Sequence, residues 1–334
     1  MKSKNTMPIF SILTPSWNRA AYLERVWRGL NSQTFRNFEW IVADDGSTDE
    51  TEEVVRLLAA QSNFPVTYIR ADKHVGKARM DNEAVRQAKG ELVLWCDSDD
   101  WLLPNATTSL WHAWCAIPQE SKDGFVGLTA LASTEAGTIA NPIANISARD
   151  VSWNDLVGTH CLTGDMLFVA RADALKEHPF PEVDLVIPES VVWTTIGHRA
   201  TRLIPEVLKM VEYRSEHAIS FSGNMSYSRG RAHALATSVR NLRSYPRPWR
   251  VRAWRLITFI RYSLHGEISL REMQQLWDSN SKALDFWLAF PLACAMAIKD
   301  RLQGKVRKTH RAFLDGKNAA HITTTELTNG VDAN

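Results

Sequence analysis

Three aspartates follow directly on an apolar run in the stretch ELVLWCDSDDWLLP, which covers residues 91–104. Like charges this close repel one another, and burying them is costly unless a positive group joins them. Asp97 and Asp99 are separated by one residue, so in an extended chain their carboxylates would point the same way and could face one cation. Carboxylates suit Mg²⁺ or Mn²⁺, which also keep positions for substrate phosphates. The alternative is a turn or helix N-cap with solvated acids, because a lone D-x-D pair is a weak signal.

Other polar and aromatic residues could serve a nucleotide. Asp44 begins the run DDGSTD, which is good turn and cap chemistry but could also accept from a nucleobase N–H. Pro15 and Trp17 follow the first apolar segment, and Trp17 either packs in the core or stacks on a base. Lys77 stands at an expected helix start, where it is either solvated or meets a diphosphate.

Alternating strand and helix patterns predict how these residues are positioned. Apolar segments typical of strands cover residues 9–13, 38–42, 66–69 and 91–95, and helical patterns cover about 20–32, 50–60 and 76–89 between them. Strands joined by crossover helices favour a parallel sheet that is covered on both faces. All carboxyl ends of such strands lie at one edge, where ligands bind. We therefore expect Asp44, Asp97 and Asp99 to share one crevice.

The alternation weakens after about residue 120. Strands are expected at 125–130 and 166–170, a helix at 191–198, and helices rich in Arg and Trp from about 229 to 315. Nine arginines and no acidic residue occur from Arg229 to Arg261. These helices either cover an aromatic core with a solvated basic face or contact an anionic membrane surface, with residues 286–290 as a second anchor.

Composition is that of an ordinary globular protein. The 334 residues are 45% hydrophobic and 23% charged, and the net charge is +2. The four cysteines have no zinc-like spacing. The N-terminus lacks the apolar core of a signal peptide, and no apolar run reaches the roughly 18 residues of a spanning helix. We expect a cytoplasmic protein, with peripheral contact to the inner face of the membrane if the basic helices bind lipid.

Two stretches together resemble the family 2 glycosyltransferases of the GT-A fold. ILTPSWNRAAYLERVWRGLNSQTFRNFEWIVADDGSTDET resembles the first motif of that family, and GKARMDNEAVRQAKGELVLWCDSDDWLLP resembles the second. The resemblance is dense from about Pro8 to Pro104. It continues more thinly through Gly164-Asp165 and HPFPEVDLVIPESVVW, as in members that assemble bacterial polysaccharides.

The resemblance implies roles for the residues that match. Pro15 and Trp17 would line the base, with Trp17 standing where the family more often has Tyr, which leaves the preferred base open. Asp44 would accept from the base N–H, and Asp97 would lie near the ribose and the metal. Asp99 would hold the metal, which bridges the donor phosphates and neutralises the leaving diphosphate.

An inverting transfer also needs a general base that deprotonates the acceptor hydroxyl. By position in the family pattern the candidate is Glu189 in VIPES, with Asp165 and Asp184 as alternatives. Without that role, Glu189 would simply be an acid in the first turn of a helix.

The expected fold is therefore α/β: a GT-A, Rossmann-like, mostly parallel sheet flanked by helices, with a basic helical C-terminal extension. Residues 1–225 would form the transferase domain, divided into a nucleotide-binding half at about 7–115 and an acceptor half at about 116–225. Residues 226–315 would form the helical region, and 316–334 a mobile tail.

The expected reaction moves a sugar from a nucleotide-sugar donor, a UDP-sugar by preference, to a glycan or polyprenyl-linked acceptor in cell-surface polysaccharide synthesis. Nucleic acid is not expected as a partner. A nucleotidyltransferase is disfavoured because Pro15-Ser16-Trp17 is not a Gly-rich phosphate loop. A non-catalytic binding or scaffold protein with the same fold stays open as the alternative.

Overall fold

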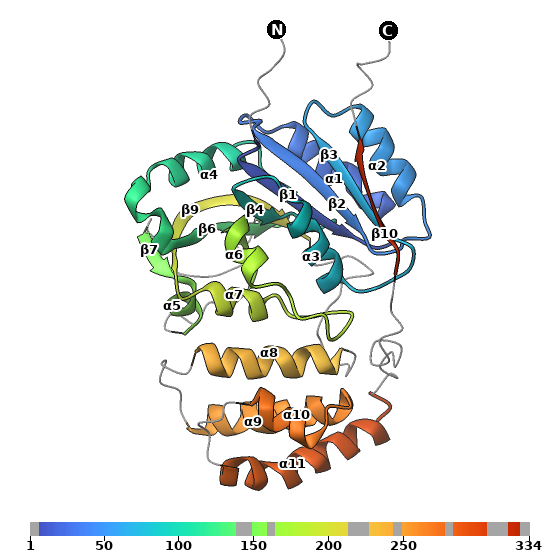
Figure 1. Cartoon of the computed structure of the whole chain (residues 1–334), viewed down its shortest axis with the longest axis vertical. Helices are drawn as coiled ribbons and strands as arrows, with labels where there is room; N and C mark the ends of the chain where they lie inside the picture. Colours follow the sequence, from blue (N-terminus) through green and yellow to red (C-terminus); the bar gives the residue numbers. More distant parts are fainter. Residues whose placement is uncertain are drawn as a thin grey trace. The chain divides into compact units, whose positions relative to one another are not determined.

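The computed structural model describes residues 7–137, 149–158, 164–212, 227–242, 249–277, 283–305 and 320–327. The chain divides into two compact units (Figure 1). Unit 1 comprises Met1–Pro179, Ile196–Ala218 and Ala320–Asn334, and unit 2 comprises Phe180–Thr195 and Ile219–Ala319. Each unit has its own buried apolar cluster.

Unit 1 is built on one mixed sheet of ten strands. Their order is β10-β3-β2-β1-β4-β8-β6-β9-β5, and β7 pairs with β9 off this path. The strands are β1 (Phe10–Ser16), β2 (Phe38–Asp44), β3 (Val66–Ala71), β4 (Leu92–Trp95), β5 (Trp101–Leu102), β6 (Phe125–Thr134), β7 (Arg149–Ser152), β8 (Met166–Arg171), β9 (Ala200–Val211) and β10 (Ile322–Leu327).

Helices connect the first four strands and cover the sheet (Figure 1). Helix α1 shows why the sequence folds this way, since Leu23, Val26 and Leu30 recur at helical spacing and are all buried. The helices of unit 1 are α1 (Ala20–Asn31), α2 (Thr51–Ala60), α3 (Lys77–Gln87), α4 (Ala106–Cys115), α5 (Trp153–Gly158) and α6 (Ala172–Glu177), with the 3₁₀ helix η1 (Gln119–Gly124) before β6.

The first four strands run parallel in the order β3-β2-β1-β4. Every residue of β2 is buried, as expected of a strand covered on both faces. Ser16 is level with Asp44, and Asp44 is level with Arg70 in β3, so the strands end at a common edge. The chain order reverses between β1 and β4, which is the point where open α/β sheets bind ligands. The predicted α/β fold is confirmed.

The other half of the sheet is mixed. Strand β8 is antiparallel to both β4 and β6, whereas β9 is parallel to β6. Gly127 in β6 permits the pairing with β8, because a Cβ atom at this position would lie 1.8 Å from the carbonyl oxygen of Val169. Strand β9, which no sequence pattern predicted, runs along β6 and brings Lys209 into the sheet.

The C-terminal strand corrects one expectation. Residues 322–327 were expected to belong to a mobile tail, but they form β10, antiparallel to β3 with Thr324 level with Ile69. Figure 1 shows β10 beside β3 at the edge of the sheet. A polar segment suffices here because the strand satisfies the N–H and C=O groups of an edge rather than filling a core. Residues 316–319 and 328–334 of the expected tail lie outside the described residues.

Unit 2 is helical. Its core contains Leu256, Phe259 and Ile260 from one helix and Phe286 and Ala293 from another. The helices are α7 (Ser190–Ile196, whose last residue belongs to unit 1), α8 (Ser228–Asn241), α9 (Trp249–His265), α10 (Leu270–Leu276) and α11 (Ala283–Leu302). Within the described ranges, no helix is both long and apolar enough to cross a membrane.

Candidate functional site

The acidic segment after β4 is a turn. The backbone N–H of Asp100 donates to the carbonyl oxygen of Asp97 at 2.9 Å. The turn is one of the alternatives that the sequence leaves open for this segment, and alternation along an extended chain does not apply to Asp97 and Asp99. A turn forms because the acids diverge: Asp100 points into the protein and meets Lys209 of β9, whose Nζ lies 2.9 Å from its carboxylate. Both side chains of that pair are 8% exposed.

Burial governs the electrostatics of this pair. Desolvation, reinforced by the charges of Asp97 and Asp99, raises the pKa of Asp100, while Lys209 opposes the rise. Burial alone would lower the pKa of Lys209, but Asp100 and Asp97 together raise it above its ordinary value. Lys209 is thus held as a buried cation beneath the acidic turn.

The other two acids meet cations from different elements. Asp97 Oδ1 lies 3.7 Å from the Nζ of Lys77, at the start of α3, and that Nζ also lies 3.1 Å from Asp81. Asp99 Oδ2 lies 3.9 Å from a guanidinium nitrogen of Arg19, just before α1. Asp97 and Asp99 are more exposed than Asp100, with 36% and 19% of their side-chain surfaces accessible. Each acid of the turn therefore has its own positive neighbour.

Asp97 and Asp99 fit a divalent cation that takes some of its ligands from the protein and the others from a substrate. Asp97 and Asp99 offer hard carboxylate oxygens, whereas Asp100 is withdrawn by Lys209. Among the described residues, no group of three or more His, Cys, Asp or Glu side chains is arranged to hold a metal ion. Two protein carboxylates are a sufficient protein contribution for Mg²⁺, which keeps waters and binds substrate phosphates at its other positions.

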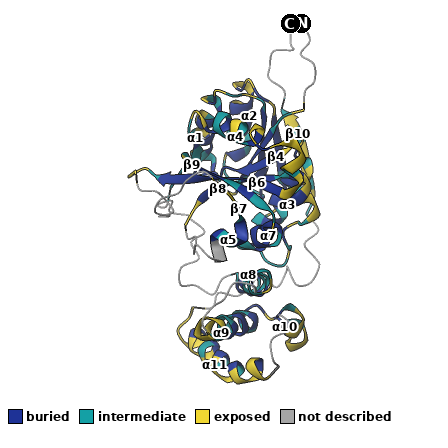
Figure 2. Ribbon diagram, turned by 90° about the vertical axis from the view of Figure 1, so that its left-hand side faces the viewer, coloured by how far each residue is buried: buried dark blue, intermediate teal, exposed yellow. Residues whose placement is uncertain are grey.

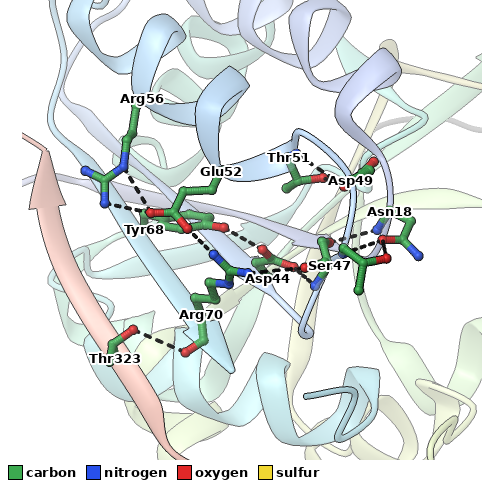
Figure 3. A network of polar contacts seen from close by, with 11 residues as sticks. Asn18, Asp44, Ser47, Asp49, Thr51, Glu52, Arg56, Tyr68, Arg70 and Thr323 are labelled. Atoms are coloured by element: carbon green, nitrogen blue, oxygen red, sulfur yellow. Dashed lines mark hydrogen bonds and ion pairs between the residues drawn. The ribbon is translucent and has the colours of Figure 1, made fainter. Parts of the chain in front are cut away.

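Asp44, at the end of β2, anchors a polar network (Figure 3). Its carboxylate accepts from the backbone N–H of Ser47 at 2.9 Å and from the hydroxyl of Tyr68. Desolvation raises the pKa of Asp44, and the hydrogen bonds from Ser47 and Tyr68 oppose that rise. Asp44 has no exposed surface, so a nucleobase N–H can reach it only if the Ser47 turn shifts. Spare carboxylate lone pairs remain for such a donor.

The same network ties the loops after β1 and β2 together. The Asn18 N–H donates to Ser47 Oγ at 2.8 Å, and the Asn18 side chain accepts from the Thr48 N–H at 2.8 Å. Figure 3 shows Arg70 continuing the network from Asp44 toward Glu52 on α2. The region that follows Pro15 is thereby held against the turn that carries Asp44.

Trp17 lies at the surface of this edge, where the sequence leaves both a core and a stacking role open. Its side chain is 47% exposed, which excludes the core alternative. Its indole stacks on the imidazole of His74, with ring centroids 4.2 Å apart and planes inclined by 14°. His74 Nδ1 lies 2.8 Å from Asp45 Oδ2, and buried Asp45 accepts from the backbone N–H groups of Val75 and Gly76. An exposed aromatic face is thus supported from below by a fixed imidazole.

The three candidates for the general base fall in different places. Asp165 is exposed just before β8 in unit 1. Asp184 belongs to unit 2, where it accepts from the backbone N–H groups of Leu185 at 2.9 Å and Gly230 at 3.0 Å. Burial raises the pKa of Asp184, although these hydrogen bonds act against the rise. Its carboxylate therefore links a loop to the start of α8.

Glu189 also belongs to unit 2 and directly precedes α7. Its Oε2 accepts from the indole N–H of Trp193 at 3.4 Å. The assignment of Glu189 stays a prediction.

Three residues of the site were missed by sequence reasoning. His74 lies three residues after the end of β3 and could have been assigned to the same edge by the parallel-strand rule. Arg19 stands two residues after Trp17, within a motif that had already been singled out. Lys209 gave no local signal, because it reaches Asp100 across 109 residues of sequence.

Comparison with known proteins places this geometry in a family. Residues 11–145 match the family described as Glycosyl transferase family 2. A β-1,3-glucosyltransferase of Campylobacter jejuni, acting on GalNAc(5)-diNAcBac-PP-undecaprenol by its name, is 34% identical over 104 residues, which are 31% of this chain and 34% of the relative. The poly(ribitol-phosphate) β-N-acetylglucosaminyltransferase TarS of Staphylococcus aureus is 35% identical over 95 residues, 28% of this chain and 16% of TarS. The matches thus span about a third or less of these relatives.

Solved structures support the fold over a longer range. The crystal structure of S. aureus TarS 1–349 in complex with UDP superposes with a TM-score of 0.55 at 15% identity, covering 88% of this chain and 91% of that one. The complex of the same fragment with UDP-GlcNAc gives a TM-score of 0.54 at 18% identity, covering 89% and 83%. Residues 11–145, which contain β1 to β4 and the acidic turn, thus match glycosyl transferase family 2, and the superposition shows that the fold of the solved TarS fragment extends over most of this chain.

Proposed function

We propose that the protein is an inverting, metal-dependent glycosyltransferase that moves a sugar from a UDP-sugar to a glycan or polyprenyl-linked acceptor in cell-surface polysaccharide synthesis. The observation that carries the proposal is the edge at the ends of β1 to β4. There a supported aromatic face at Trp17 and two partly exposed carboxylates, Asp97 and Asp99, occur beside cationic side chains. This set of groups suits a nucleoside diphosphate: a flat base, two phosphates and a shared cation.

The names of the relatives support the choice of donor and acceptor. The C. jejuni relative carries an undecaprenol-linked substrate in its name, and TarS fragments have been crystallised with UDP and UDP-GlcNAc. We extend these chemistries to this chain as part of the proposal.

On the donor side, Trp17 and Pro15 line the base and Asp44 accepts from its N–H. Lys77 approaches the diphosphate from the start of α3, where backbone N–H groups and the helix dipole also favour an anion. Asp97 and Asp99 would hold Mg²⁺ or Mn²⁺, which when bound neutralises charge on the leaving diphosphate. Arg19 remains beside Asp99 and adds positive charge at the same edge.

On the acceptor side, Glu189 takes the proton of the attacking hydroxyl. As that oxygen forms its bond to the anomeric carbon, the bond from this carbon to the diphosphate oxygen breaks on the opposite face. One displacement of this kind inverts the anomeric configuration.

The test is calorimetric titration of UDP into the purified protein, with Mn²⁺ and with a chelator, on the wild type and on Asp99→Ala. We expect binding that requires Mn²⁺ and is weakened by Asp99→Ala. Asp123→Ala is the matched control, because it removes an acid that is 99% exposed and pairs with Arg171 away from the acidic turn.

Turnover separates the enzyme from a scaffold. UDP release from UDP-GlcNAc or UDP-glucose, lost in Asp99→Ala but kept in Asp123→Ala, would support the transferase. Metal-dependent binding of UDP without turnover on any donor and acceptor tried would favour the non-catalytic alternative. A retained anomeric configuration in the product would contradict the single displacement.

A further inference from the structure

Helix α11 has one face that belongs to the core of unit 2. Phe286, Ala289 and Ala293 recur at helical spacing and pack in the same cluster as Phe259 and Ile260 of α9. Near the end of α11, Asp300 is also buried, and its carboxylate pairs with the Arg261 guanidinium of α9 at 2.5 Å. This face fixes the orientation of α11 against α9.

The opposite face of α11 is apolar and exposed. At 3.6 residues per turn its large side chains fall within less than half of the helix circumference, in a stripe about 27 Å long. Figure 2 shows exposed residues along this helix. The stripe consists of Leu284, Trp287, Leu288, Leu292, Ile298 and Leu302, with exposed fractions from 50% for Trp287 to 83% for Leu302.

A helix that is apolar all round is normally covered all round. Here one side is covered by α9, and the other exposes a Trp and five large aliphatic side chains in a row. Single exposed hydrophobic residues need no explanation, but a contiguous apolar stripe marks an interaction surface. The stripe therefore requires a partner that accepts apolar side chains over its whole length.

The charges of α9 and α11 indicate the kind of partner. Helix α9, which contains no Asp or Glu, exposes Arg250 and Arg252 between the exposed rings of Trp249 and Trp254. The exposed charges of α11 are mainly two cations, Lys299 and Arg301, in its last turn.

Acidic charge is scarce on the same two helices. The acids of α11 are Asp285, exposed in the first turn, and Asp300, which Arg261 neutralises in the interior. An anionic surface complements this pattern. A second copy of the same face would bring the exposed cations of two chains together, which costs free energy.

We propose that the α11 stripe lies in the interfacial layer of an anionic phospholipid membrane. The leucines and Trp287 enter the boundary between headgroups and acyl chains, as the apolar face of an amphipathic helix does. Arg250, Arg252, Lys299 and Arg301 then meet lipid phosphates at headgroup level. Exposed tryptophans such as Trp249 and Trp254 suit the same layer, because their rings are amphipathic.

Vesicle co-sedimentation of the purified full chain tests the proposal. The vesicles contain phosphatidylcholine alone or phosphatidylcholine mixed with phosphatidylglycerol, and neither nucleotide nor acceptor is present. We expect binding to the anionic vesicles and a loss of more than about tenfold in the triple variant Trp287→Ser/Leu288→Gln/Leu292→Gln. The matched control is Leu57→Gln, which changes a side chain that is 63% exposed on α2 of unit 1.

Two further measurements complete the test. Arg250→Gln/Arg252→Gln should reduce the preference for anionic over neutral vesicles and the sensitivity of binding to salt. Circular dichroism and unfolding curves show whether the variants keep their helices, which we expect because every changed side chain is exposed. Because the assay needs no turnover, its outcome is independent of the proposed transferase activity.

The outcomes that overturn the proposal are definite. Equal vesicle binding by the wild type and a folded triple variant would exclude the stripe as the contact surface. The wild type could instead fail to bind vesicles and form a dimer in light scattering. If the triple variant were then monomeric, the stripe would be the interface with a second copy of the chain.

Discussion

The indole of Trp17 rests on the imidazole of His74 with their planes inclined by only 14° and their centroids 4.2 Å apart. His74 in turn lies against Asp45, which holds the backbone before α3 through Val75 and Gly76. A side chain proposed to stack on a base is thus itself stacked on a fixed ring. The orientation of Trp17 is set before a nucleotide arrives, which reduces the ordering cost of binding.

Removal of this support should weaken donor binding. In His74→Ala, Trp17 loses an aromatic partner worth about 0.5–1.5 kcal/mol, so we expect the Kd for UDP to rise about two- to tenfold. His74→Phe keeps the stack and should retain most of the affinity. Calorimetry measures both constants, and kcat at saturating donor should change less than KM. Equal losses in the Ala and Phe variants would show that the contact with Asp45 matters rather than the stack.

The general base can be separated from its neighbours by amide substitutions. Glu189→Gln removes the proton acceptor but keeps the shape, so we expect transfer to fall by about 10²–10⁴-fold while the Kd for UDP stays within about twofold. Asp184→Asn should retain transfer, because Asp184 is engaged by Leu185 and Gly230. The measurements are the transfer rate and calorimetry on the same preparations. Full activity in Glu189→Gln, with a loss in Asp165→Asn instead, would move the base to Asp165.

The buried pair under the acidic turn gives a stability prediction. Lys209→Met leaves Asp100 buried beside Asp97 without its cation, and we expect the free energy of unfolding to fall by about 3–5 kcal/mol. The double variant Lys209→Met/Asp100→Leu removes both charges and should recover most of that loss. Urea unfolding at constant pH measures the three proteins. Additive losses in the double variant would mean that the two side chains do not act as a pair.

Sequence patterns predicted the part of the site that local rules control. Apolar runs and helical patterns placed β1 to β4 and the helices between them, and the strands pair in parallel as expected. These predictions succeeded because a strand buried on both faces is continuously apolar and a covering helix is periodic. Both signals are local.

The predictions that failed depend on partners distant in sequence. Alternation along an extended chain does not apply to Asp97 and Asp99, because the segment is a turn in which Asp100 pairs with Lys209. Strand β10 lacks an apolar face from which a strand could be predicted, because it forms by pairing with the edge of β3. The stacking of His74 on Trp17 could not be predicted, because it depends on the distance between two loops, which no local sequence pattern gives.

The β10 strand should stabilise unit 1 in a measurable way. A chain ending at residue 319 would expose the N–H and C=O groups of the β3 edge, so we expect a lower melting temperature and more aggregation. A chain ending at residue 327 keeps the strand and is the matched control. Lys89→Ala removes only the exposed ion pair with Glu326 and should cost about 0.5 kcal/mol or less. An unchanged melting temperature for the chain ending at 319 would show that β10 adds no net stability.

Unit 2 should lose stability in mild acid because of His233 in α8. Burial, aided by the positive charges of Arg229 and Arg240, lowers the pKa of His233 to about 4 from an ordinary value of 6.5. Between these two values the unfolded chain binds a proton that the folded chain does not. Stability is therefore complete above the unfolded pKa, falls as the pH drops from about 6.5 toward 4, and levels off below.

The size of that loss separates His233 from other titrating groups. At pH 5 we expect a cost of about 2 kcal/mol relative to pH 7.5. His233→Gln keeps a neutral polar side chain at every pH and should remove this part of the pH dependence, which urea unfolding of the two proteins at both pH values would measure. The matched control is His112→Gln in α4 of unit 1, whose exposed ring should leave the difference between the two pH values unchanged. An equal pH dependence in wild type and His233→Gln would place the acid sensitivity elsewhere, with buried His265 beside Asp300 as the next group to substitute.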